Sequence, residues 1–248
     1  MGSLPYALQL YTVRDHMETD PAGTLERVKE IGYDYVEIAG YSGKSPAEFI
    51  QMLGGAGLAP TSSHFGFTEV TTTPESVIET CGVLGVSYAV VGTSHDDKAS
   101  WLKAAADLDR GGAVLHKAGI QLCYHNHAHE LEKYDGVTAL DLLYENTAPE
   151  HLAAEIDTCW IKYGKADIVE WITKCSGRCP LLHIKDMTPN THPTFAEVGR
   201  GIIDWAPVFE AAKAAGAVWY IVEQDTCPGD SLESARISAE FMARQWEL

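Results

Sequence analysis

The feature that most constrains the fold is a regular alternation between short apolar segments and longer amphipathic ones. The short segments are rich in Val, Ile, Tyr and Leu, which favour β-strands, and most are apolar along their whole length. Strands of this kind are typical of a parallel sheet with both faces buried by helices. Eight such strands are expected, over residues 6–13, 33–39, 58–65, 86–93, 120–126, 152–158, 181–186 and 218–224.

The residues between these segments carry the signals of helix ends. Residues that cap helices precede three prolines, which predicts helix starts at Pro21, Pro46 and Pro74. Ser45 and Glu48 have the spacing of a capping box. Glycines that are typical of helix ends precede five of the strands, at Gly32, Gly57, Gly85, Gly119 and Gly216.

This order of strands and helices predicts an α/β protein. Eight strands joined by right-handed helical crossovers close into a barrel, so we expect a single-domain (β/α)8 TIM barrel over residues 1–248. The main alternative is an open doubly wound sheet. It is disfavoured because no G-x-G-x-x-G follows the first strand and no G-x-x-x-x-G-K-[ST] occurs in the chain.

The composition restricts the partners and the compartment. The chain has 18 basic and 35 acidic residues, a net charge of −17, and no run of three basic residues. Nucleic-acid binding needs Lys and Arg to neutralise phosphates, so no nucleic-acid partner is expected. No segment resembles a membrane span or a secretion signal, and the six scattered cysteines are expected to be reduced thiols. These features predict a cytoplasmic protein without a membrane partner.

Ionisable side chains gather at the expected carboxyl ends of the last four strands. His125 and His127 share a face of the fifth strand, and Asp157, His183 and Glu223 follow on the next three. In a TIM barrel these strand ends meet at one mouth, where active sites lie. A buried carboxylate needs a cation or a bonded partner, and carboxylates together with imidazoles favour a divalent metal.

Five motifs of this region resemble one known family. They are YHNH-x-x-E (124–130), EIDTCW (155–160), LHIKDM (182–187), EVGRGIIDW (197–205) and YIVEQD (220–225). Together they resemble the sugar phosphate isomerase/epimerase family of xylose isomerase-like TIM barrels. The resemblance covers nearly the whole chain and is specific from the fifth strand onward. In the first half only VEIAG around Glu37 and SSHFG around His64 are similar.

The resemblance implies one divalent metal ion, held in the family by a Glu after strand five, an Asp after strand six, a His on strand seven and a Glu on strand eight. Asp157, His183 and Glu223 match the last three positions. Cys123 stands where the first Glu is usual, so Glu130 is the candidate fourth ligand. The alternatives to Glu130 are a water molecule, Glu37, His125 and His127. Manganese is the first choice of metal, with magnesium, cobalt and zinc as alternatives.

The reaction implied by the resemblance begins with removal of a proton next to a carbonyl and passes through an enediolate. Imidazole has a pKa suited to this at neutral pH, so His125 is the first choice for the base, with His127 and Glu130 as alternatives. Lys185 could bind a substrate oxygen or stabilise the oxyanion. The candidates for substrate binding are Glu37, His64 and Trp160.

Two activities fit this scheme. The first is a sugar isomerase or epimerase, and the alternative is a lyase or dehydratase that expels a β-leaving group from an inosose or a 3-ketoglycoside. The imidazole-rich strand five is closer to inosose dehydratases and keto-sugar lyases than to ketose epimerases. A nuclease on the same barrel is disfavoured by the acidic composition, and a non-catalytic carbohydrate-binding module by the many ionisable groups.

The expected partner is a small sugar or keto-sugar, and a homo-oligomer stays open because barrels of this kind frequently pair. Phosphate on the sugar is not assumed. The one glycine-rich stretch that could contact an anion is Gly199-Arg200-Gly201, and its alternative is a simple turn.

Overall fold

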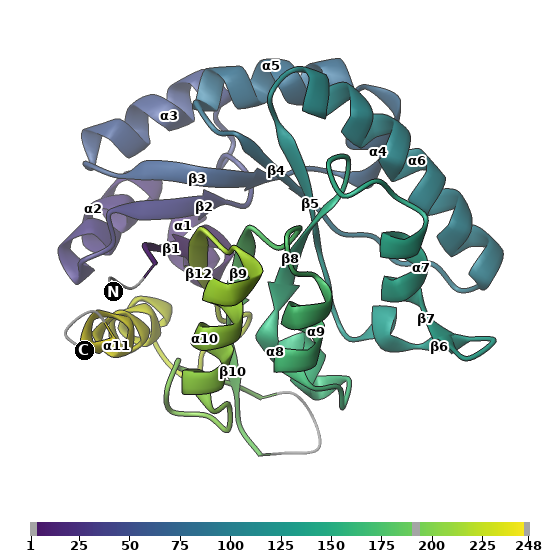
Figure 1. The fold of residues 1–248 in the computed structure, drawn as a ribbon. Coiled ribbons are helices and arrows are strands. Elements are labelled where there is room, and N and C mark those ends of the chain that lie inside the picture. The colour runs from purple at the N-terminus through teal and green to yellow at the C-terminus, as the bar shows by residue number, and fades with distance from the viewer. Residues whose placement is uncertain (1–3, 190–193, 246–248) are drawn as a thin grey trace.

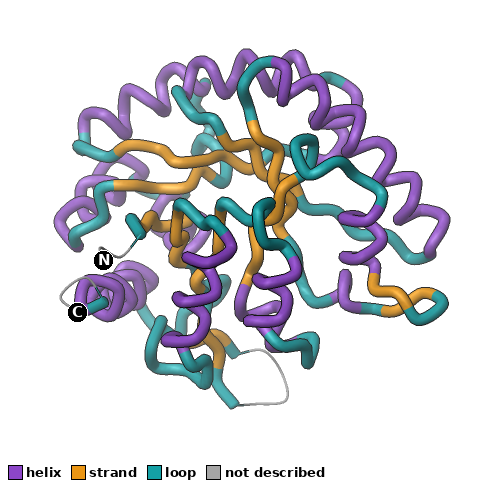
Figure 2. Tube along the Cα trace, in the orientation of Figure 1, coloured by secondary structure: helices purple, strands orange, loops and turns teal. Residues whose placement is uncertain are grey.

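The computed structural model describes residues 4–189 and 194–245, and its centre is a closed barrel. Eight parallel strands pair in the order β1-β12-β9-β8-β5-β4-β3-β2, which confirms the predicted (β/α)8 barrel. Helices surround these strands in Figure 1, and Figure 2 separates the two kinds of element by colour. The barrel strands are β1 (Tyr6–Gln9), β2 (Tyr35–Ile38), β3 (Ala59–His64), β4 (Tyr88–Val91), β5 (Gln121–His125), β8 (Ala153–Asp157), β9 (Leu181–Ile184) and β12 (Trp219–Val222).

The outer layer consists of helices that connect successive barrel strands. In the described residues, no helix combines the length and apolar character that crossing a membrane requires. Two short antiparallel pairs lie outside the barrel: β6 (Lys133–Tyr134) with β7 (Val137–Thr138), and β10 (Asp186–Met187) with β11 (Phe195–Ala196). The helices are η1 (Leu10–Val13), α1 (Arg14–Met17), α2 (Pro21–Ile31), α3 (Pro46–Gly55), α4 (Phe67–Thr72), α5 (Pro74–Leu84), α6 (Lys98–Lys117), η2 (His129–Leu131), α7 (Ala139–Glu145), α8 (Thr158–Tyr163), α9 (Ile168–Lys174), α10 (Trp205–Ala215) and α11 (Ser231–Arg244).

The predicted helix ends are confirmed. Helices α2, α3 and α5 begin at the three prolines, and φ is positive at all five glycines expected to end helices. Asp20 caps α2, and Ser45 and Glu48 form the capping box of α3. Thr73 differs, because its hydroxyl donates to the carbonyl oxygen of Glu69 at the end of α4, 3.2 Å away. Its side chain therefore makes no hydrogen bond that caps α5.

The first strand is shorter than predicted. A strand was expected over residues 6–13, but β1 ends at Gln9. The side chain of Gln9 accepts a hydrogen bond from the backbone N–H of Tyr11 at 3.0 Å, and the chain turns there into η1.

The barrel interior is built in layers by the alternation of side chains along each strand. An apolar layer comprises Ala7, Val90, Cys123, Ala153, Leu181 and Ile221. Burial raises the pKa of the Cys123 thiol, which is fully buried in this layer. Two residues further along five of these strands, the next inward-facing side chain is polar: Gln9, His125, Glu155, His183 and Glu223. The polar site therefore begins one layer above Cys123.

Candidate metal centre and active site

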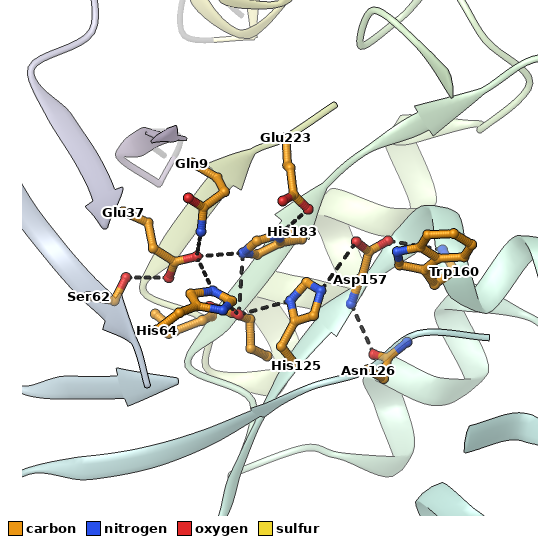
Figure 3. A network of polar contacts seen from close by, with 12 residues as sticks. Gln9, Glu37, Ser62, His64, His125, Asn126, Asp157, Trp160, His183 and Glu223 are labelled. Carbon is orange, nitrogen blue, oxygen red and sulfur yellow. Dashed lines mark hydrogen bonds and ion pairs between the residues drawn. The ribbon is translucent and has the colours of Figure 1, made fainter. Parts of the chain in front are cut away.

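Buried polar side chains from strands around the barrel converge at its carboxyl end (Figure 3). The parallel register places His125 beside Glu155 and Asp157 beside His183. Nδ1 of His125 lies 3.0 Å from Oε2 of Glu155, and its Nε2 lies 3.8 Å from Oδ2 of Asp157. The imidazole is thus held by one carboxylate and directs its other nitrogen toward a second.

His183 has the same arrangement. Its Nδ1 lies 2.9 Å from Oε2 of Glu223, and its Nε2 lies 2.8 Å from Oε1 of Glu37. Glu37 is itself fixed, because Gln9 donates to its Oε1 at 2.7 Å and the hydroxyl of Ser62 donates to its Oε2. Glu37, predicted as a substrate-binding residue, is fully buried behind His183.

His64 extends from β3 toward the same carboxylates. Its Nε2 lies 2.8 Å from Oε1 of Glu37 and 3.5 Å from Oε2 of Glu155. Burial alone would lower the pKa of His64, but the charges of Glu37 and Glu155 raise it to about 10. Burial would likewise raise the pKa of Glu155, but the charge of His183 and the hydrogen bond from His125 hold it well below its usual value.

Lys185 supplies a buried ammonium group beside these carboxylates. Its Nζ lies 2.6 Å from Oδ1 of Asp225, 3.1 Å from Oε2 of Glu223 and 3.4 Å from Oδ2 of Asp157. Burial would lower the pKa of Lys185, but these three carboxylates raise it. The ammonium also lies 5.0 Å from the ring centroid of Trp160.

Four donor residues meet the requirements of a divalent-metal site. His125, Asp157, His183 and Glu223 each offer a donor atom within 4.8 Å of the others. Oδ2 of Asp157 is buried and accepts no hydrogen bond, so it is available to a cation. In metal sites a ligating imidazole usually donates its second nitrogen to a carboxylate, the role that Glu155 and Glu37 can fill here. A second group of candidate metal ligands comprises His64, His125, Glu155 and His183. It has His125 and His183 in common with the first group.

Glu130 does not join Asp157, His183 and Glu223. It lies on η2 and groups with His127 and His129 instead. Its carboxylate accepts hydrogen bonds from the hydroxyl of Tyr124 at 3.0 Å and from the backbone N–H of His127 at 2.9 Å. The physical reason is that β5 ends at His125, so the alternation that keeps its side chains on the inner face stops before Glu130.

A cavity of about 320 Å³ opens over the polar site. Four predicted residues line it: His64, His125, His127 and Glu223. His127 is partly exposed there, and burial together with the charges of His125 and Lys185 lowers its pKa to about 3. Trp160 is not one of the lining residues, but its ring lies 5.5 Å from that of His127.

The glycine-rich stretch is a turn that closes on the protein's own carboxylate. The backbone N–H groups of Gly199 and Gly201 donate to Oδ2 of Asp186, at 3.0 and 3.1 Å. The indole of Trp205 donates to the same oxygen at 3.2 Å. These backbone amides already donate to a carboxylate of the protein. Of the two interpretations of this stretch, a simple turn is therefore favoured over a contact with a substrate anion.

Sequence reasoning missed Glu155, Gln9 and Asp225 as members of the site. Glu155 and Asp157 are two residues apart, so the alternation along β8 places both on the inner face, and this signal was available. Gln9 follows Ala7 in the same way on β1. No sequence signal linked Asp225 to Lys185, because 40 residues separate them.

Comparisons with known proteins agree with this architecture. An inosose dehydratase of Geobacillus kaustophilus is 24% identical and covers 93% of this chain and 88% of its own length. A sugar phosphate isomerase/epimerase structure from Parabacteroides distasonis has 25% identity and a TM-score of 0.84, covering 98% of this chain and 94% of its own. The IOLI protein, solved with a zinc atom, shares the fold at 16% identity and a TM-score of 0.75, covering 97% of each chain. Residues 25–245 match the xylose isomerase-like TIM barrel family, and the chain belongs to that family.

Proposed function

We propose that the protein is a divalent-metal-dependent sugar isomerase or epimerase that removes a proton next to the carbonyl of a keto-sugar. The observation that carries this proposal is the group formed by His125, Asp157, His183 and Glu223, of which His125 and Glu223 line the cavity. The names of the relatives, inosose dehydratase and sugar phosphate isomerase/epimerase, support a sugar as the substrate class.

These four residues would hold the metal, with His125 in place of the expected carboxylate of strand five. Oδ2 of Asp157, which accepts no hydrogen bond, and the gathering of buried carboxylates around it fit a divalent cation. When bound, such an ion supplies Lewis acidity that stabilises negative charge on a carbonyl oxygen. Because both nitrogens of His125 are then engaged, the role of base passes from His125 to its predicted alternative, His127.

His127 can act as the base because it lines the cavity and carries an imidazole, the side chain that most often serves as a general base. Lys185 remains charged and lies beside Glu223 and Asp157, so it can stabilise negative charge on a substrate oxygen. His64 lines the cavity as an imidazolium and can donate a hydrogen bond to a sugar hydroxyl.

Elimination of water is the second candidate outcome of the same proton abstraction. Two findings favour it: the relatives named above include an inosose dehydratase, and His64, whose pKa is raised by the charges of Glu37 and Glu155, lines the cavity and could protonate a leaving hydroxyl. The two outcomes share His127 as the base and differ only in what the intermediate does next.

Product analysis by NMR in D2O tests the proposal and separates these outcomes. The protein would be loaded with Mn²⁺ and incubated with keto-sugars, inososes and 3-ketoglycosides. We expect deuterium at the carbon next to the carbonyl, together with either an isomer that keeps all its oxygen atoms or a product that has lost water. The proposal is refuted if the loaded protein exchanges no such proton in any of these compounds.

A further inference from the structure

A separate set of metal-type donors lies just after β5 and has no part in the metal centre described above. This outer group comprises His127, His129 and Glu130, each of which offers a donor atom within 4.8 Å of the others. Oε1 of Glu130 lies 3.3 Å from Nε2 of His129 and 4.0 Å from Nδ1 of His127. Two donor atoms on a tetrahedral zinc ion are roughly 3.3 Å apart, so small side-chain movements would let one ion contact all three residues.

The carboxylate of the outer group is buried without a permanent counter-charge. Glu130 has no exposed surface, and in the described part of the chain its ion-pair partners are the imidazoles of His127 and His129 alone. When these imidazoles are neutral, the buried charge is stabilised by hydrogen bonds from Tyr124 and from the backbone of His127. A divalent cation would supply the missing positive charge.

These hydrogen bonds fix Glu130 and leave one oxygen free to bind an ion. Because Oε2 accepts the backbone N–H of His127, Oε1 faces the two imidazoles. The hydroxyl of Tyr124 lies 3.0 Å from Oε1 and also 3.0 Å from the carbonyl oxygen of Thr93. A hydroxyl has one proton, so Tyr124 can donate to Thr93 when a cation occupies Oε1.

The two imidazoles make the outer group accessible to ions in solution. The side chains of His127 and His129 are 43% and 36% exposed. Nε2 of His129 lies 3.1 Å from the carbonyl oxygen of Thr93, to which it can donate in the absence of metal. A metal ion would bind the other neutral tautomer, with the proton on Nδ1, so binding requires no change in the charge of the ring.

The donor set favours zinc. Two imidazoles and one carboxylate are a common set of zinc ligands, and imidazole sites bind Zn²⁺ more tightly than Mn²⁺. We propose that His127, His129 and Glu130 bind a Zn²⁺ ion, and that this ion inhibits the enzyme by occupying its base. A neutral imidazole has a single lone pair. Once a metal ion uses that lone pair on Nδ1, His127 has none left to accept a proton from the substrate. The inhibition rests on the proposed function, whereas the ion site does not.

Counting ions tests the site without turnover. Chelator-treated protein would be equilibrated with excess Zn²⁺, freed of unbound ion and measured by elemental analysis, with thermal unfolding to establish that each variant is folded. We expect two ions per chain in the wild type and one in His129→Ala. His116→Ala is the matched control, because His116 is exposed in the last turn of α6, and it should keep two. Asp157→Asn should keep one ion, bound at the outer group.

The counts separate failure of the outer group from failure of the proposed metal centre. Equal counts in the wild type and His129→Ala would overturn the outer site. One ion in the wild type, lost in His129→Ala but kept in Asp157→Asn, would support the outer site and refute the metal centre.

Inhibition of the Mn²⁺-loaded protein tests the effect on the base. Excess Zn²⁺ should slow proton exchange at least tenfold in the wild type and in His116→Ala. In His129→Ala, measured against its own rate without zinc, the loss should be less than twofold. Replacement of Mn²⁺ by Zn²⁺ at the metal centre would act on all three proteins alike. Equal inhibition of the wild type and His129→Ala would therefore overturn the inhibitory role.

Discussion

Replacing Glu155 with glutamine tests whether this buried carboxylate orients the proposed metal ligands. Its Oε2 lies 3.0 Å from Nδ1 of His125 and 3.3 Å from Nε2 of His183, while its Oε1 accepts no hydrogen bond. The substitution keeps the size of the side chain but removes its charge. We therefore expect metal affinity to fall while the barrel stays folded.

The size of the effect follows from the contact with His125. A hydrogen bond to a charged group contributes about 1.5–3 kcal/mol, and glutamine retains at most a neutral bond in its place. At about 1.4 kcal/mol per factor of ten, losing most of this contribution weakens binding by roughly 10- to 100-fold. The same range is typical when a residue that supports a metal ligand is replaced.

Isothermal titration of chelator-treated protein with Mn²⁺ would measure this change. Glu132→Gln is the matched control, because Glu132 is exposed in the loop before β6. Thermal unfolding without metal would establish that both variants are folded. Should folded Glu155→Gln bind Mn²⁺ within twofold of the wild type, Glu155 does not orient the ligands and the assignment of His125 as a ligand loses its support.

Three further predictions follow from the same structure. Asp157→Asn should lower metal content from about one ion per chain to near zero by elemental analysis; unchanged content would remove Asp157 from the site. His127→Ala should keep the metal but lower kcat by roughly 10²- to 10⁴-fold, the usual loss with a general base, and full activity would exclude it as the base. Gly112→Ala would place a Cβ 2.0 Å from the carbonyl oxygen of His151, so urea unfolding should show a loss of about 1–3 kcal/mol. Gly54→Ala meets no atom within 4 Å and serves as its control.

The sequence predicted the barrel because its signals are local. Strand composition, capping residues such as Ser45, and glycines such as Gly216 act over a few residues, so a linear pattern suffices to find them. The polar strand ends at Asp157, His183 and Glu223 could be located for the same reason. Their chemistry is carried by residue type and by position at the end of a strand.

The partners of each side chain depended on tertiary structure. His125 and His127 would share a face only if β5 continued beyond His125. Because the strand ends there, His127 lies outside it and groups with His129 and Glu130 instead. The contacts of Glu155 with His183 and of Glu37 with His64 depend on strand register and barrel closure. The sequence by itself determined the fold class and which strand ends carry ionisable groups, whereas only the closed barrel decided which of these groups meet. The physical reason is that pairing across a barrel joins residues far apart in the chain, and no local pattern encodes those distances.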